Sequence, residues 1–184
     1  QFPTTRVHTN SRTEMNNRMG GSVAIVSSNW AGFVVTGNTY TDPMGLGILN
    51  SLSFCARDYR ISVLNAYFPP TTGSSGPATL NTSITRYQNR PTMPTVASRQ
   101  SPNEFVRGLT QKLILQRRAQ GYAVILTGDL NETQNAPAHR SFVHATQLLN
   151  PLHTAFGADP CFHTRNANSQ TMRNTAIDHA LHTP

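Results

Sequence analysis

The stretch YAVILTGDLNET, residues 122–133, constrains the fold more than any other part of the chain. Its apolar run at 124–126 lies between Gly121 and Gly128, which is typical of a buried strand. Asp129 follows at once, in a chain with only eight acidic residues. A carboxylate at the end of a buried strand costs desolvation free energy unless its surroundings compensate it. Two interpretations are open: a solvated turn, since Gly, Asp and Asn are common turn residues, or a functional site.

The same kind of pattern predicts further strands on both sides of this one. A Gly-Gly turn precedes an apolar run at 23–26, and a short strand is expected around 33–35. Alternating residues predict a hairpin with strands at 48–54 and 59–66, turning at 56–58 and ended by Pro69 and Pro70. Strands are also expected near 161–164 and 175–181, whereas residues 1–19 look like a polar loop.

Two helices are predicted between these strands. Ser101, Pro102 and Glu104 form a capping box with a proline start, and an apolar stripe follows at Phe105, Val106, Leu109 and Leu113. Arg107, Lys112, Arg117 and Arg118 are expected on the solvent side, and Gly121 ends the helix. A second helix is predicted at 137–149. Residues 71–100, rich in Thr, Ser, Pro, Gly and Asn, are predicted to be a long irregular insertion, and Glu132 a solvated loop residue.

Composition indicates one soluble domain over residues 1–184. The formal net charge is +7, and fourteen of the fifteen Lys and Arg residues are Arg. Arg binds phosphate with two hydrogen bonds, so a polyanionic partner such as nucleic acid is expected. A genome-wide bias from Lys to Arg would explain the choice of cation, but it would not explain the shortage of acids. Without a signal peptide or a long apolar stretch, the expected location is intracellular and no membrane partner is expected. Cys55 and Cys161 are expected to be free thiols rather than a bridge.

Polar side chains follow three of the predicted strands. They are Asn65 and Tyr67, Asp129 and Asn131, and Asp178. A site for a phosphate ester needs carboxylates to hold a divalent metal or a water molecule, and neutral donors to stabilise charge on the phosphate oxygens. These residue types supply both, so the strand ends are candidates for such a site.

Four blocks carry a family resemblance: GGSVAIV, ISVLNAYFPP, VILTGDLNET and RNTAIDHAL. Their order and spacing resemble the endonuclease/exonuclease/phosphatase superfamily, and most closely the endonuclease domain of non-LTR retrotransposons. The resemblance covers about residues 18–184. It implies an α+β, DNase I-like fold, a two-sheet β-sandwich flanked by helices, here lacking its first and last active-site strands.

The resemblance also implies roles by position in a Mg²⁺- or Mn²⁺-dependent endonuclease. Asp129 would position or deprotonate the attacking water, and Asn131 would bind the scissile phosphate; both are also candidate metal ligands. Tyr67 would contact that phosphate with support from Asn65, and Asp178 would orient a catalytic histidine. For DNA contact, the resemblance points to Thr164, while Arg165 and Arg173 flank the turn before Asp178 and are equally well explained as solvated loop cations.

The departures from the family pattern leave a second interpretation open. The family's Gln-Glu metal-binding pair would lie before Gln1, and its Ser-Asp-His block beyond Pro184. His179 neighbours Asp178 on a strand, so we expect it to face the opposite side. The chain is therefore either the central part of an endonuclease, completed by more of a larger polyprotein or by another chain, or a catalytically inactive remnant that binds nucleic acid.

Overall fold

The computed structural model describes residues 6–10, 22–71, 79–132, 135–151 and 178–184. Within these ranges the strands and helices follow one another in a mixed α and β order. They are β1 Arg6–Asn10, β2 Ser22–Val26, α1 Ser28–Ala31, η1 Thr36–Asn38, β3 Tyr40–Thr41, β4 Leu49–Ala56, β5 Tyr59–Ala66, α2 Leu80–Gln88, η2 Ala97–Arg99, α3 Pro102–Ala119, β6 Ala123–Asp129, α4 Pro137–Thr146 and β7 Asp178–His182.

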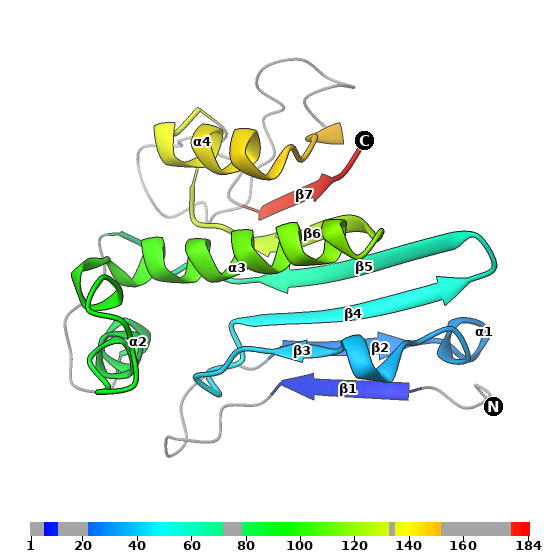
Figure 1. The fold of residues 1–184 in the computed structure, drawn as a ribbon, viewed down its shortest axis with the longest axis horizontal. Helices are drawn as coiled ribbons and strands as arrows, with labels where there is room; N and C mark the ends of the chain where they lie inside the picture. The colour runs from blue at the N-terminus through cyan, green and yellow to red at the C-terminus, as the bar shows by residue number, and fades with distance from the viewer. Residues whose placement is uncertain (1–5, 11–21, 72–78, 133–134, 152–177) are drawn as a thin grey trace, which may run out of the picture.

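A five-stranded mixed sheet is the centre of the fold, with the strand order β3-β4-β5-β6-β7. The pair β5 and β6 is parallel, and the other neighbours are antiparallel. A parallel pair needs a crossover connection, which here contains α2 and α3. Figure 1 shows β5 and β6 pointing the same way, so the residues that follow both strands come out at one edge of the sheet.

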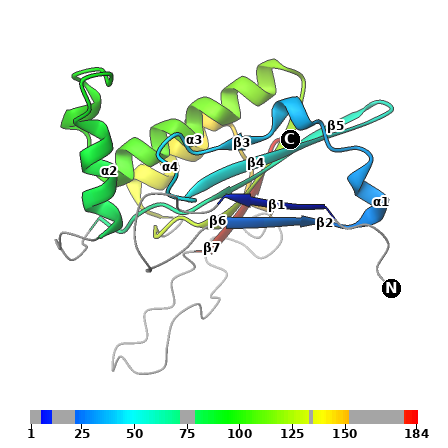
Figure 2. The same cartoon turned by 90° about the horizontal axis from the view of Figure 1, so that it is seen from below.

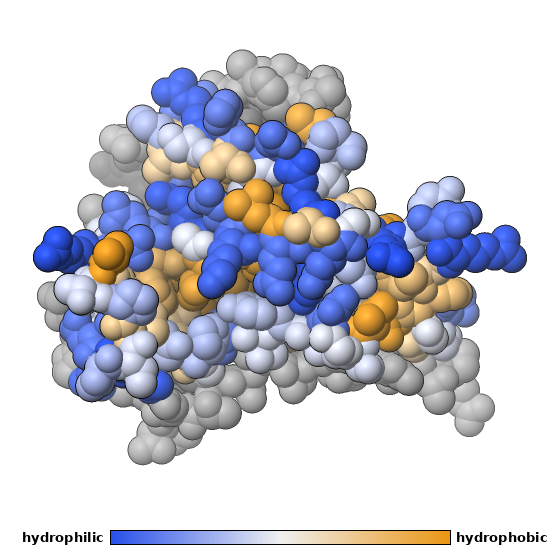
Figure 3. All heavy atoms as spheres, in the orientation of Figure 1, coloured by the Kyte–Doolittle hydropathy of each residue, from blue (hydrophilic) through white to orange (hydrophobic). Residues whose placement is uncertain are grey.

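Helix α3 covers one face of this sheet, as its apolar stripe predicts. Its buried residues Phe105, Val106 and Leu113 belong to the same core cluster as Leu64 of β5 and Leu126 of β6. Ser101 accepts a hydrogen bond from the backbone of Glu104, whose side chain bonds back, so the predicted capping box is confirmed. Figure 2 shows α3 and α4 on one side of the sheet and β1–β2 on the other, and in Figure 3 hydrophilic side chains gather over α3.

The antiparallel pair β1–β2 is a small second sheet over the opposite face. Val26 of β2 packs with Leu52 of β4 and Ala31 in a separate apolar cluster. Strand β1 corrects the prediction of a loop for this part of 1–19. The expected strand at 33–35 is instead a single bridge between Val34 and Phe54, because the chain turns into η1 directly afterwards.

The segment 71–100 is not irregular throughout, since it contains α2 and η2. The Thr79 side chain caps α2 by accepting from the Thr82 backbone, and Ile84 is fully buried. The high Thr, Ser and Asn content predicted a loop here. The helix is nevertheless stable because its apolar face packs against the core, and not because of intrinsic helix propensity. The solvent position predicted for Arg117 is also wrong: this side chain is 4% exposed. It donates to the Asn38 carbonyl at 2.6 Å, and burial lowers its pKa from the ordinary value.

The remaining predicted elements are confirmed where the structure describes them. Strands β2, β4, β5 and β6 and helix α4 lie close to their expected ranges. Strand β7 begins at Asp178; the strand expected at 161–164, with Cys161, lies outside the described residues. Cys55 is a free thiol. Among the described residues, no helix is both long and apolar enough to cross a membrane.

Candidate active site at the ends of strands β5 and β6

The parallel pairing of β5 and β6 brings two of the predicted polar pairs to the same sheet edge. Asn65 lies opposite Thr127 in the register. Beyond the last paired residues, the Phe68 backbone N–H donates to the Asp129 carbonyl at 3.0 Å. The segment after β5, which carries Tyr67, therefore runs directly beside Asp129.

Gly128 permits this close approach of the two strand ends. Its φ is +137°, a backbone conformation that residues other than glycine rarely adopt. A Cβ atom built on it would lie 1.9 Å from the carbonyl oxygen of Ala66. The glycine before Asp129 is thus required by the contact with the end of β5.

A tight turn follows, in which Asp129 and Asn131 are joined. The Asn131 backbone N–H donates to Oδ1 of Asp129 at 2.9 Å, the bond that defines an Asx turn. Asn131 has φ +48°, in the left-handed region that Asn tolerates better than most residues. Its side-chain Nδ2 donates to the Phe68 carbonyl at 2.9 Å. Asp129 and Asn131 would share a face only if the strand continued beyond Asp129; the strand ends at Asp129, and the turn brings the two residues together.

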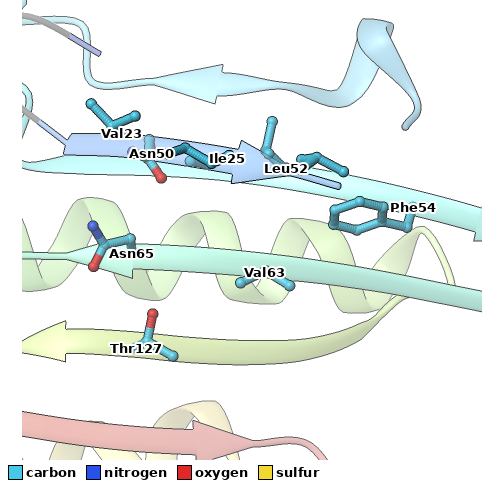
Figure 4. Close-up of a pocket in the computed structure, with 10 residues that line it drawn as sticks. Val23, Ile25, Asn50, Leu52, Phe54, Val63, Asn65 and Thr127 are labelled. Carbon is cyan, nitrogen blue, oxygen red and sulfur yellow. The ribbon is translucent and has the colours of Figure 1, made fainter. Parts of the chain in front are cut away.

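Tyr67 and Asn65 lie on the β5 side of the same edge. Tyr67 is 37% exposed, and its backbone N–H donates to the Ile48 carbonyl at 2.8 Å. Asn65 is half-buried on the sheet face opposite α3 and lines a groove of about 260 Å³ between β2 and the sheet. Figure 4 shows Asn50, Asn65 and Thr127 on the neighbouring strands β4, β5 and β6.

Asn50 lines the same groove as Asn65, and sequence reasoning missed it. It lies opposite Asn65 in the register, and its Nδ2 donates to Ser22 Oγ at 2.5 Å. Its side chain is therefore directed to β2. The signal was present in the alternation of GILNSLSF, which places Asn50 on the same face as Leu52 and Phe54.

Strand β7 brings Asp178 into register with Asp129, as cross-strand partners at the end of the β6–β7 pair. The backbone thus places 129 and 178 side by side at the edge where β6 ends. The other predicted contact residues, Thr164, Arg165 and Arg173, lie outside the described residues.

Glu132 is not the solvated loop residue that the sequence predicted. Its side chain is 8% exposed and forms an ion pair with the Arg107 guanidinium of α3. Desolvation raises the pKa of Glu132 above its ordinary value, and Arg107 lowers it by less. Sequence reasoning missed the pair because nothing in the local pattern tells which residue of a distant helix will face the turn.

The oxygen atoms at this edge are of the type that Mg²⁺ prefers. Asp129 supplies a carboxylate. Asn131 supplies an amide oxygen, while its amide nitrogen donates a hydrogen bond to the Phe68 carbonyl. Mg²⁺ commonly takes one or two carboxylates and completes its shell with water and phosphate oxygens. One carboxylate and one amide oxygen are compatible with the ligands that Mg²⁺ takes, Asp129 being the charged group. In the described part of the chain, no group of three His, Cys, Asp or Glu side chains gathers at a potential metal position.

The arginines of α3 and those of α2 and the segment after it differ in their exposure. Three on α3 bond to the protein itself: Arg107 to Glu132, Arg117 to Asn38, and Arg118 to the Thr146 carbonyl at 2.7 Å. A second group is exposed on α2 and the segment after it, namely Arg86, Arg90 and Arg99. No Asp or Glu occurs in residues 71–100, so this segment presents positive charge to the solvent.

Comparison with known proteins identifies the fold. No family model matches the chain, and no curated protein sequence matches it. Similar solved structures include the human Nocturnin catalytic domain with bound sulfate (13% identity, TM-score 0.58, 97% of this chain and 60% of that one). They also include an endonuclease/exonuclease/phosphatase family protein from Bacteroides thetaiotaomicron (16%, 0.56, 99% and 60%) and a mannosyl-6-phosphatase from the same organism (16%, 0.57, 99% and 64%).

These likenesses confirm the predicted fold class. The mixed five-stranded sheet flanked by helices matches the DNase I-like α+β fold of these neighbours. At such low identity the likeness establishes the fold and leaves the chemistry to the residues at the site. The chain spans less than two thirds of the length of each of the three proteins.

Proposed function

We propose that this chain is a divalent-metal-dependent phosphodiesterase that hydrolyses nucleic-acid phosphodiester bonds, an endonuclease of the retroelement type. The observation that carries the proposal is the meeting of two polar strand ends. The Asp129–Asn131 turn is hydrogen-bonded to both the N–H and the carbonyl of Phe68, directly after Tyr67. These bonds support the proposal that the Asp129 carboxylate, the Asn131 amide and the Tyr67 phenol act together at one edge of the sheet.

Each residue at the edge has a role in this proposal. Asp129 accepts the proton of the attacking water or orients it, which is general-base work. Asn131 and Tyr67 donate hydrogen bonds to phosphate oxygens as negative charge builds on them. Asn65, at the end of β5, supports Tyr67 in the segment that follows, and Asp178 would orient a catalytic histidine, not assigned among the described residues, that protonates the leaving oxygen.

A Mg²⁺ or Mn²⁺ ion held by Asp129, with the Asn131 amide oxygen beside it, would neutralise charge on the phosphate. The protein's own contribution is to fix the ligand geometry. Asp129 is held at its backbone by Phe68 and at its Oδ1 by the Asn131 N–H.

Exposed arginines are the proposed contacts to the rest of a nucleic acid. Figure 1 shows α2 beyond the end of the sheet toward which β5 points. The exposed Arg86 of α2, with Arg90 and Arg99 in the segment after it, would bind backbone phosphates next to the cleaved one. Thr164, Arg165 and Arg173 are proposed as further contacts.

The structural neighbours support the broader class. One is described as a phosphatase and one by its endonuclease/exonuclease/phosphatase family. A phosphoester substrate is therefore consistent with the fold. The narrower proposal of a nucleic-acid diester also rests on the net positive charge of this chain.

A substrate comparison tests the proposal. The chain would be incubated with Mg²⁺ and supercoiled plasmid, bis-p-nitrophenyl phosphate or p-nitrophenyl phosphate, with EDTA as the control. We expect metal-dependent cleavage of the plasmid and the diester, and at least about tenfold slower cleavage of the monoester. A preference for the monoester would contradict the assignment as a phosphodiesterase.

A second candidate function is a catalytically inactive module that binds nucleic acid. The observation that favours it is the acid-free segment 71–100 with its exposed arginines. Salt-dependent binding of a labelled DNA duplex without any Mg²⁺-dependent cleavage would establish this candidate in place of the enzyme.

A further inference from the structure

The start of helix α3 is bonded to both loops that form the candidate site. Asn103 donates from Nδ2 to the Pro69 carbonyl at 2.7 Å, in the segment that follows Tyr67. Arg107, one turn later, donates to Oδ1 of Asn103 at 2.5 Å and to the carboxylate of Glu132. Glu132 directly follows Asn131. One arginine therefore connects the segment after β5 to the turn after β6.

This connection is largely removed from water. The side chains of Arg107 and Glu132 are 15% and 8% exposed, and Asn103 is 2% exposed. The Arg107 guanidinium lies 6.0 Å from the ring centre of Phe68, the residue whose backbone bonds to Asp129 and Asn131. Charged hydrogen bonds of this kind are stronger than neutral ones, and here one guanidinium nitrogen, Nη2 of Arg107, donates to both acceptors.

The turn has a reason to need such a restraint. Asn131 holds a positive φ, which is sparsely populated for residues other than glycine and persists only where the surroundings impose it. Within the turn, Asn131 is held by one bond to Asp129 and one to Phe68. The ion pair at the next residue adds a third attachment, and it anchors the turn to a helix rather than to another loop.

We propose that Arg107 is a positioning residue for the candidate site: by binding Glu132 and Asn103 together, it holds the Asp129–Asn131 turn against the segment that carries Tyr67. Arg107 itself does not touch substrate. The kinetic part of this inference rests on the proposed function, whereas the positioning part concerns the fold alone and is measured separately.

Amide hydrogen exchange measures the positioning directly in the 184-residue chain. The reporters are the N–H groups of Asn131 and Phe68, which both bond to Asp129. In Arg107→Met we expect the exchange rates of both N–H groups to rise at least about tenfold more than the change in the global free energy of unfolding accounts for. The reason is that exchange through local opening depends on the local rather than the global free energy. Arg118→Met is the matched control: this residue is also on α3 and bonds Thr146 and Gln147 instead. It should leave both reporters unchanged.

A double variant separates positioning from simple charge burial. Arg107→Met alone leaves Glu132 without its guanidinium partner, which is itself destabilising, whereas removing both charges often restores stability. Arg107→Met with Glu132→Met should therefore regain global stability and still show fast exchange at Asn131. Wild-type exchange in the double variant would overturn the proposal. If Arg107→Met does not fold, the double variant, in which neither charge remains, carries the test alone.

Kinetics extend the test to the reaction. In the double variant kcat for the diester should fall by about 100-fold with KM changed less than about threefold, since a displacement of about 1 Å costs a rate factor of that order. An unchanged kcat with altered exchange would overturn the kinetic role. If the wild-type chain cleaves nothing but the exchange results are as expected, the proposed function fails and the positioning role stands.

Discussion

Gly128→Ala tests the reasoning that the two strand ends are in direct contact. The new methyl carbon would lie 1.9 Å from the Ala66 carbonyl oxygen, and the backbone would have to hold φ +137° with a side chain attached. Strained backbone costs about 1–3 kcal/mol, and an added methyl group in a close-packed site costs about 1–3 kcal/mol more. We therefore expect a loss of about 4 kcal/mol, a large part of the roughly 5–15 kcal/mol that stabilises an ordinary domain.

Two other glycines separate the contributions of strain and contact. Gly121 has φ +79°, but an added Cβ atom would meet no other atom within 4 Å, so Gly121→Ala should cost only about 1–2 kcal/mol. Gly108, inside α3, has neither strain nor a close atom, and Gly108→Ala should stabilise by about 0.5–1 kcal/mol. Urea unfolding of the three variants, with the slope checked for constancy, gives the comparison. A Gly128→Ala loss no larger than that of Gly121→Ala would refute the contact between the strand ends.

Three further predictions concern the start of α3 and the exposed arginines. Ser101→Ala should lower the free energy of unfolding by about 1 kcal/mol in thermal or urea melts, because it removes the N-cap. Hydrogen bonds from Ser101 lower the pKa of Glu104 below its ordinary value. The stability that this carboxylate adds is therefore fully present above the unfolded-state pKa. It is lost as the pH falls through the lower folded-state pKa. Melts of Glu104→Gln and the unmodified chain should therefore differ near neutral pH and converge at low pH; a constant difference would refute this. Replacing Arg86, Arg90 and Arg99 with Ser should reduce the slope of log K against log salt for DNA binding by about 0.9 for each phosphate that is no longer neutralised, and an unchanged slope would remove these residues from the interface.

The elements with strong periodicity were predictable from the sequence. Helix α3 was indicated by its capping box and apolar stripe, and β5 by its alternation, because in both cases local geometry decides which side is buried. Helix α2 was missed because its Thr, Ser and Asn residues favour caps and turns, while its burial depends on distant contacts such as those of Ile84.

The position of the candidate site at the sheet edge was partly predictable, whereas the roles of its residues stay predictions. A carboxylate after a buried strand was a sound indication of the sheet edge, and the parallel pairing of β5 and β6 accounts for its position beside Tyr67. The turn conformation of Asn131 was not predicted, since a residue two places after Asp129 lies on the same face only if the strand continues. The partners of Arg107 and Arg117 depend on tertiary packing, which no local pattern encodes.

The central claim, that Asp129 acts on a phosphodiester, is tested most directly by the Mg²⁺-dependent nicking rate of Asp129→Asn. The matched control is Asp58→Asn, which changes an exposed carboxylate in the β4–β5 hairpin turn. General acid–base catalysis contributes about 10²–10⁴-fold to a rate, so Asp129→Asn should nick supercoiled plasmid at least about 100-fold more slowly, while Asp58→Asn keeps the rate of the unmodified chain. Equal nicking by Asp129→Asn and the unmodified chain would contradict the account.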